Sequence, residues 1–168
     1  MPIGLAGFPT MWTKPRFWYH ISEKNLGYKA YFEPREIECL GEPSRPRICV
    51  SPTVAHCLSA ICAHDKVYVY RTYRKMSARY PYGICDSYIT KDRWLFGETC
   101  FLRQLTIKYD DLGLHEFSCA RGDPFELGRQ EDEYTDICIS LMQSGLIEEY
   151  PHIDFVAPKM LRELRAMV

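Results

Sequence analysis

The sequence predicts one domain of the α+β class, with a central split or mixed β-sheet, helices packed on it and a helical C-terminal tail. The chain has 168 residues, of which 46% are hydrophobic, so it can bury a substantial core. Short β-branched and aromatic runs separated by turn residues fill residues 16–120, whereas helical periodicity dominates residues 130–168. We therefore expect residues 1–168 to form a single domain whose core is in the first of these segments.

Two extended segments precede the first helix. Residues 16–21 read RFWYHI, a dense aromatic run that is typical of a β-strand, and polar turn residues follow it. Residues 30–35 form a second extended segment, and the sequence GEPSRP at residues 41–46 indicates a loop. These patterns predict the first strands of the sheet and the connection to the next unit.

A strand–turn–helix unit follows at residues 48–61. Its first three residues, ICV, are typical of a strand, and apolar residues then recur at the i, i+3, i+4 and i+7 spacing of one helix face. We expect Ser51 to cap this helix and Pro52 to occupy its first position. Such a turn can present Ser51, Thr53 and free backbone N–H groups to an anion. An ordinary capped helix that packs on a sheet is the alternative.

The next part of the chain continues the sheet. The run VYVYRTY at residues 67–73 predicts a central strand. Alternating apolar side chains, among them Phe101 and Leu105, predict another strand at residues 100–109. Shorter extended segments are expected at residues 88–90, 93–96 and 114–119.

The last part of the chain is expected to be helical. One helix is predicted up to residue 146, with the acidic residues 131–133 at its N-terminal end, where negative charge is favourable. Pro158 opens a second helix over residues 159–165. These helices can cover the sheet or dock on a partner.

The charge composition bounds the class of partner. The formal net charge is −1, which favours neither a general nucleic-acid grip nor a polybasic membrane anchor. One segment, residues 71–79, is locally basic and aromatic. A nucleic acid could contact this segment through Arg71, Arg74, Lys75 and Arg79. A solvated loop without such a contact is the alternative.

The cysteines and the termini indicate a reduced, cytoplasmic protein without a membrane segment. The eight cysteines form no CxxC pair, and several lie in apolar runs where a thiol behaves as a small hydrophobic group. No stretch has the pattern of a signal peptide or the length of a membrane span. No metal is expected, because the most metal-like residues share neither one helix face nor a usual zinc spacing. These residues are His56, Cys57, Cys62 and His64.

Three short motifs resemble the core of ADP-ribosyltransferase-like proteins. That family has a Tyr-His or similar pair on its first strand, a Ser or Thr where a strand ends before a helix, and a late Glu that begins another strand. The first motif here is YHIS at residues 19–22, and the second is CVSPT at residues 49–53. The closest late match is Asp92 in KDRWLF at residues 91–96, and Glu98 is the nearest glutamate.

The resemblance covers residues 17–109 and implies NAD as the cofactor, with transfer of ADP-ribose to a macromolecular target that we expect to be a protein. His20 would orient the cofactor, Ser51 would close the nicotinamide-ribose pocket, and Tyr68 or Tyr31 would stack on a ring. The full set of cofactor-binding residues implied is Tyr19, His20, Ser51, Thr53 and Tyr68.

The same resemblance implies that Asp92 or Glu98 takes the place of the catalytic Glu and stabilises positive charge on the ribose. An aspartate is shorter by one methylene group. It can misplace the charge by about 1 Å and slow the transfer on the order of 10²-fold.

A second hypothesis is a catalytically inactive interaction protein on the same scaffold, such as a phage-encoded inhibitor of a host defence complex. The short length, the 14% aromatic content and the imperfect carboxylate motif favour it, whereas His20 and Ser51 favour the enzyme. A structural role is also open to each residue: His20 as a half-buried histidine, Asp92 as a solvated turn charge, and Tyr68 as a packing residue. Convergence of His20, Ser51 and either Asp92 or Glu98 on one cleft would support the enzyme.

Overall fold

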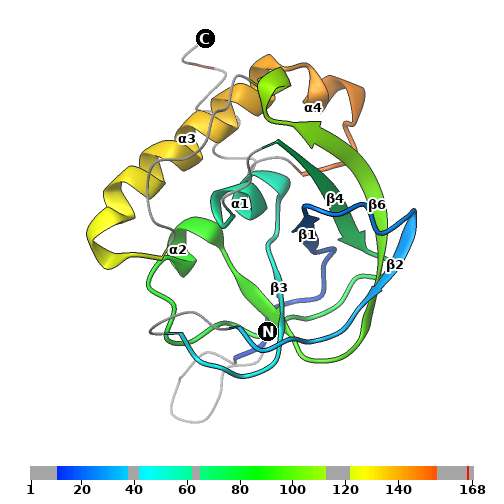
Figure 1. Cartoon of the computed structure of the whole chain (residues 1–168), viewed down its shortest axis with the longest axis vertical. Helices are drawn as coiled ribbons and strands as arrows, with labels where there is room; N and C mark the ends of the chain where they lie inside the picture. Colours follow the sequence, from blue (N-terminus) through cyan, green and yellow to red (C-terminus); the bar gives the residue numbers. More distant parts are fainter. Residues whose placement is uncertain (1–10, 38–41, 62–64, 113–121, 155–165, 167–168) are drawn as a thin grey trace.

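The computed structural model describes residues 11–37, 42–61, 65–112, 122–154 and 166, which adopt an α+β fold (Figure 1). An antiparallel sheet has four strands in the order β1-β4-β6-β2, and a smaller sheet pairs β3 with β5. The strands of the larger sheet are β1 (Tyr19–Ser22), β4 (Lys66–Thr72), β6 (Thr99–Lys108) and β2 (Lys29–Phe32), and those of the smaller are β3 (Ile48–Val50) and β5 (Arg93–Leu95). The predicted α+β class and the division of the sheet are confirmed.

The larger sheet contributes side chains to two hydrophobic clusters, one on each of its faces. On one face Val67 and Val69 of β4 pack with helices α1 and α3. On the other face Tyr70 of the same strand packs with residues of β3 and β5, such as Val50 and Leu95. Because successive strand residues point to opposite faces, β4 supplies both clusters by simple alternation. Its position between β1 and β6 makes it an internal strand, as predicted.

A β-bulge in β6 changes which face its side chains reach. The pairing with β4 shifts by one residue after Val69, so Gln104 is passed over in the ladder. Phe101 consequently packs in the cluster with β3 and β5, whereas Leu105 packs in the cluster with the helices. Regular alternation of the sequence would put both side chains on one face, and the bulge is the reason that they separate.

Helix α1 (Val54–Ser59) is buried between the larger sheet and α3 (Figure 1). Its N-cap is Thr53, whose hydroxyl accepts a hydrogen bond from the backbone N–H of His56 at 3.2 Å. The prediction that Ser51 caps the helix and that Pro52 opens it is therefore wrong. Ser51 instead pairs with Tyr19 of β1 through two backbone hydrogen bonds, which keep it in extended conformation.

Helix α3 (Leu127–Gln143) packs on the core, and the short helix α4 (Leu146–Glu149) follows it. Ile137, Cys138 and Leu141 are fully buried along one stripe of α3. This helix therefore covers the sheet. It begins before the predicted acidic start, so residues 131–133 do not occupy its first turn.

The predicted extended segment at residues 88–90 is instead part of a short helix, α2 (Ser87–Thr90). The backbone N–H of Lys91 donates to Ser87 O at 2.8 Å and closes the turn. Ile89 is buried by this turn, so tertiary packing overrides its strand preference. The strand predicted at residues 114–119 and the helix predicted at residues 159–165 lie outside the described residues. Within the described ranges, no helix has the length and apolar character needed to cross a membrane.

Candidate functional site

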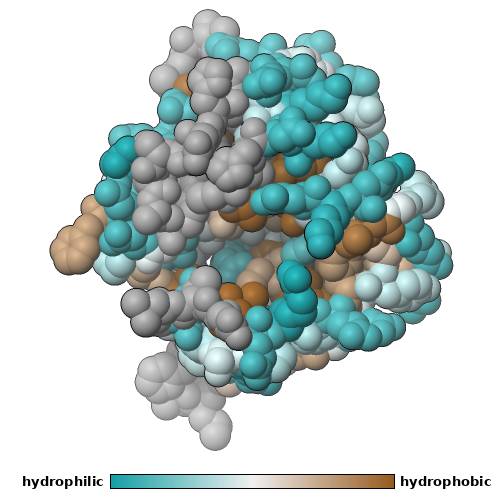
Figure 2. Space-filling view, viewed as in Figure 1, coloured by the Kyte–Doolittle hydropathy of each residue, from teal (hydrophilic) through white to brown (hydrophobic). Residues whose placement is uncertain are grey.

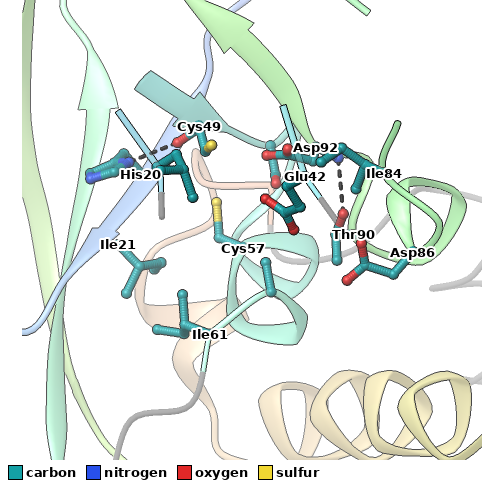
Figure 3. Close-up of a pocket in the computed structure, with 13 residues that line it drawn as sticks. His20, Ile21, Glu42, Cys49, Cys57, Ile61, Ile84, Asp86, Thr90 and Asp92 are labelled. Carbon is teal, nitrogen blue, oxygen red and sulfur yellow. Dashed lines mark hydrogen bonds between the residues drawn. The ribbon is translucent and has the colours of Figure 1, made fainter. Parts of the chain in front are cut away.

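Segments that are distant in the sequence meet at a cavity beside β1, the edge strand of the larger sheet. This first cavity has a volume of about 250 Å³ and lies between β1, the end of β3, α1 and the connection from α2 to β5. Figure 2, viewed from the same side as Figure 1, shows a hollow lined by hydrophobic atoms near the middle of the molecule. Figure 3 shows the side chains around the cavity. Its polar and ionisable lining residues are His20, Glu42, Cys49, Ser51, Cys57, Asp86, Thr90 and Asp92.

His20 is a neutral hydrogen-bonding group at this cavity. Its Nδ1 lies 2.8 Å from the carbonyl oxygen of Cys49, so Nδ1 carries the proton and Nε2 keeps a lone pair that can accept a hydrogen bond. The rings of Phe32 and Phe101 lie 4.8 Å and 5.9 Å from the imidazole, centroid to centroid. Burial lowers the pKa of His20, the Cys49 carbonyl opposes this effect, and the positive charge of Arg35 adds to it.

Ser51 is held next to His20 by the pairing of β1 with the end of β3. The backbone N–H of Ser51 donates to Tyr19 O at 3.0 Å, and the N–H of Tyr19 donates to Ser51 O at 2.9 Å. Since His20 directly follows Tyr19, this pairing places both Ser51 and His20 in the lining of the same cavity.

Asp92, which directly precedes β5, places a carboxyl group at the cavity. Its Oδ2 accepts a hydrogen bond from Trp94 Nε1 at 3.1 Å, and its backbone N–H donates to Thr90 Oγ1 at 3.1 Å. Burial raises the pKa of Asp92 to about 7; the Trp94 hydrogen bond opposes this rise and the charge of Asp86 adds to it. The carboxyl group is therefore present in both charge states near neutral pH and is not a solvated turn charge.

Two further carboxylates border the cavity, and each has a fixed partner. Glu42 accepts a hydrogen bond from Arg47 at 3.0 Å, and the guanidinium of Arg47, which is almost completely buried, lies 4.3 Å from the ring centroid of Trp94. Asp86 accepts a hydrogen bond from Gln130 of α3 at 2.9 Å. Sequence reasoning missed both acids, because each lies in a turn-like stretch and reaches the cavity only through tertiary contacts.

Cys49 and Cys57 face the cavity as neutral thiols (Figure 3). Burial raises the pKa of each thiol to about 12. Cys57 also donates a hydrogen bond to Tyr19 O at 3.0 Å. Because the thiolate is the nucleophilic form, these cysteines do not serve as nucleophiles at neutral pH. The five cysteines that the structure describes are all free.

A second cavity, of about 630 Å³, adjoins the first at His20, which lines both. It lies between the end of β1 and the segment that contains β2. Tyr31 offers an exposed ring there, and the charged lining residues are the cations Lys24 and Arg35 and the glutamates Glu23, Glu33 and Glu98. Glu98 lines this second cavity and not the first.

His20, Ser51 and Asp92 all line the first cavity. Tyr19, Thr53 and Tyr68 line neither of the two cavities. The three lie elsewhere for separate reasons: the Tyr19 hydroxyl accepts a hydrogen bond from Asp154 N at 3.3 Å, Thr53 caps α1, and Tyr68 packs against the cluster with β3 and β5.

Among the residues that the structure describes, no three or more His, Cys, Asp or Glu side chains are arranged to hold a metal ion. Comparisons of the chain with protein-family models, with curated proteins and with solved structures give no match. The chemistry of the two adjacent cavities is therefore the basis for a functional assignment.

Proposed function

We propose that the protein binds NAD across the two adjacent cavities and transfers ADP-ribose to a macromolecular target, the activity of the family that its motifs resemble. The observation that carries this proposal is the convergence of His20, Ser51 and Asp92, which come from three separate segments, on the first cavity. Transfer from NAD requires the nicotinamide ribose to be oriented beside a carboxylate. These three residues supply an imidazole, a hydroxyl and a carboxyl group for that purpose.

The volumes of the two adjacent cavities suit a ligand of the size of NAD. Small-molecule sites usually have volumes of about 300–1,000 Å³, and the two cavities have about 250 Å³ and 630 Å³. The first would hold the nicotinamide riboside and the second the adenosine, with the pyrophosphate near His20. Lys24 and Arg35 are the cations of this lining and would face the pyrophosphate, whereas Glu23, Glu33 and Glu98 add negative charge to the same lining. Tyr31 offers a ring face to the adenine.

Asp92 would stabilise the positive charge that develops on the ribose as nicotinamide leaves. Only the ionised carboxylate has this effect. Because its pKa is about 7, the ionised fraction rises through neutral pH, and a cationic nicotinamide ring nearby would increase that fraction.

Thermal unfolding across an NAD titration tests the cofactor site. NAD at about 100 times its dissociation constant would add about 2.7 kcal/mol to the free energy of unfolding, a shift of several degrees in Tm for a domain of this size. His20→Ala and the more conservative His20→Gln are expected to reduce the shift.

His152→Ala is the matched control, because His152 is exposed and lines neither cavity. It should keep the full NAD shift. The absence of a shift at millimolar NAD, or an equal shift in both His20 variants, would contradict the proposal.

The catalytically inactive interaction protein is a second candidate, and the exposed aromatic residues favour it. Phe125 is 97% exposed, and Tyr88 of α2 is half exposed. Large exposed rings are frequent anchors of protein interfaces. If this candidate is correct, a target protein co-purifies with the wild type and is lost with Phe125→Ser, and no NAD shift occurs. NAD-dependent labelling of that target would support the enzyme instead.

A further inference from the structure

A third cavity, of about 360 Å³, lies on the opposite face of the β3–β5 pair from the first cavity. Consecutive residues of an extended chain point to opposite sides. Ser51 and Asp92 accordingly line the first cavity, whereas their neighbours Pro52 and Arg93 line the third. The remaining lining residues of the third cavity are Thr13, Lys14, Arg16, Trp18 and Tyr80.

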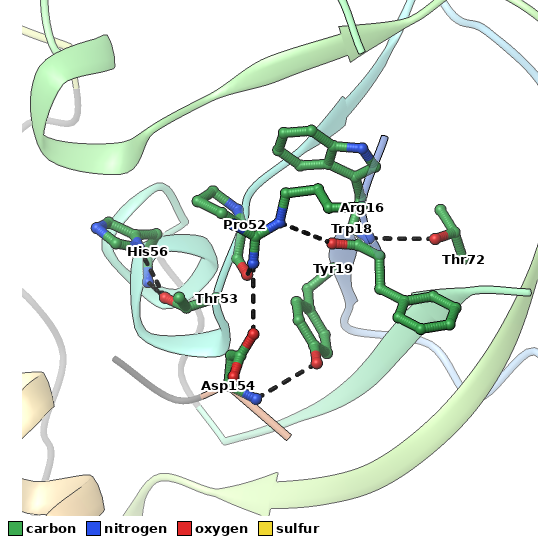
Figure 4. Close-up of polar contacts among 9 residues, drawn as sticks. Arg16, Trp18, Tyr19, Pro52, Thr53, His56, Thr72 and Asp154 are labelled. Atoms are coloured by element: carbon green, nitrogen blue, oxygen red, sulfur yellow. Dashed lines mark hydrogen bonds and ion pairs between the residues drawn. The ribbon is translucent and has the colours of Figure 1, made fainter. Parts of the chain in front are cut away.

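Positive charge at this cavity exceeds what the surrounding residues neutralise. Its lining includes three cationic side chains and no carboxylate. Arg16 forms an ion pair with the exposed Asp154 at 3.3 Å and donates to the carbonyl of Pro52 at 2.7 Å (Figure 4). Lys14 and Arg93 form no ion pair with any described residue. Burial lowers the pKa of Arg93, and the nearby Tyr80 and Asp92 oppose this effect.

Aromatic rings lie next to these cations. Tyr80 is 42% exposed, and the guanidinium carbon of Arg93 lies 4.5 Å from its ring centroid. Trp18 forms a second wall, and Arg16 lies 5.5 Å from its ring centroid. Because Arg16 and Arg93 are each held near a ring and Lys14 adds a third positive charge, the cavity suits a ligand that is flat at one end and anionic at the other.

The backbone next to the cavity extends the positive surface. Residues 11–16 run antiparallel to residues 76–80, and one of the hydrogen bonds between them joins Thr13 N to Ala78 O at 2.8 Å. The segments 11–18 and 71–80 contain six Lys or Arg residues and no Asp or Glu, although the whole chain has a net charge of −1. Four of the six are Arg71, Arg74, Lys75 and Arg79.

We propose that the third cavity binds a nucleotide, with the phosphate held by Lys14, Arg16 and Arg93 and the base placed against Tyr80. A free mononucleotide and one residue of a single-stranded nucleic acid share this chemistry. Since positive charge continues along the neighbouring segments, a phosphate backbone could follow them beyond the cavity. The site is independent of the NAD proposal, because it lies on the other face of the β3–β5 pair and shares no lining residue with the first or second cavity.

Fluorescence anisotropy with a labelled single-stranded RNA of 12 nucleotides tests this site in the full chain. Unlabelled AMP, inorganic phosphate and a short polyglutamate peptide serve as competitors. Tyr80→Ser is expected to weaken RNA binding about fivefold or more through the loss of stacking. Lys14→Glu is expected to weaken it and to reduce the salt dependence by about one unit of the log–log slope. Lys108→Glu, an exposed charge reversal that lines none of the three cavities, is the matched control.

The competitors identify the source of the nucleotide. RNA binding that Tyr80→Ser and Lys14→Glu weaken, and that the control keeps, supports a nucleic-acid ligand. Binding of fluorescently labelled AMP, followed by the same anisotropy measurement, without binding of RNA and with the same variant pattern, supports a free nucleotide. No binding of either at millimolar concentration, equal binding by all variants, or competition by polyglutamate as strong as by AMP overturns the proposal. His20→Ala should leave this binding unchanged, so failure here is distinguishable from failure of the NAD proposal.

Discussion

At the scale of single residues, the buried carboxyl group of Asp92 couples folding to pH. Its pKa of about 7 in the folded protein is above the ordinary value of 3.8. Between pH 4 and pH 7 the unfolded chain therefore loses this proton first, and the folded state becomes less stable as pH rises. The buried His20 and His56 act in the opposite direction, because their lowered pKa values destabilise the folded state as pH falls below about 6.5.

Asp92→Asn isolates the carboxyl contribution from that of the histidines. The substitution should increase the free energy of unfolding more at pH 8 than at pH 4.5, by about 1–3 kcal/mol at roughly 1.4 kcal/mol per pKa unit. Urea unfolding at both pH values measures the difference. Asp110→Asn, at an exposed position, should show no such pH dependence. An equal effect of Asp92→Asn at both pH values would show that the pKa is not raised.

The same residue provides a test of the proposed transfer reaction. Nicotinamide release from NAD should increase from pH 6 to pH 8 as Asp92 ionises, and Asp92→Asn should reduce it on the order of 10²-fold because the stabilising charge is lost. The NAD-dependent thermal shift should persist in this variant, since an amide still accepts the hydrogen bond from Trp94. Unchanged nicotinamide release by Asp92→Asn would show that Asp92 takes no part in the reaction. Glu98→Gln would then be the next variant to test.

Sequence motifs identified His20, Ser51 and Asp92 as candidate site residues, and all three line the first cavity. The motifs did not identify the other residues that line it. Each of the three belongs to a short strand–turn pattern that can be recognised locally. Glu42 and Asp86 depend on Arg47 and Gln130, partners whose spatial proximity no local pattern encodes.

At the scale of elements, the N-terminus of α1 depends on one side chain with two functions. Thr53 Oγ1 accepts the capping hydrogen bond and also lies 2.6 Å from Nδ1 of His56, while the other ring nitrogen of His56 lies 3.1 Å from the hydroxyl of Tyr134 in α3. The cap therefore also connects α1 to α3. The position of Thr53 could not be predicted from sequence, because Ser51 has equal capping ability and only its pairing with β1 excludes it.

Thr53→Ala should lower the free energy of unfolding by about 1–2 kcal/mol, the upper range for loss of a cap, since a second hydrogen bond is lost with it. Thr53→Ser keeps the hydroxyl and should recover most of the stability. Chemical denaturation of the two variants measures this difference. Equal destabilisation by Ala and Ser would mean that the methyl group, and not the hydroxyl, accounts for the effect.

At the scale of the whole molecule, the larger sheet is shared by the two hydrophobic clusters, so we expect them to unfold together. Leu141→Ala leaves a cavity in the cluster with the helices and should lower the free energy of unfolding by about 2–5 kcal/mol. Val50→Ala leaves a smaller cavity in the cluster with β3 and β5 and should lower it by less. In both variants, tryptophan fluorescence and far-UV circular dichroism should report one coincident transition. Two separate transitions in either variant would show that the clusters are independent.

The bulge in β6 makes the number of residues between Phe101 and Leu105 as important as their chemistry. Phe101 and Leu105 are four residues apart, and regular alternation would point both side chains to the same face. The bulge leaves Gln104 without a partner in β4, so the two side chains face opposite ways. Exchange of Gln104 for another polar residue keeps this parity. Deletion of Gln104 would restore regular pairing and direct the side chains of one half of β6 to the opposite face of the sheet. The length of this segment therefore helps to specify the fold, independently of which side chains it carries.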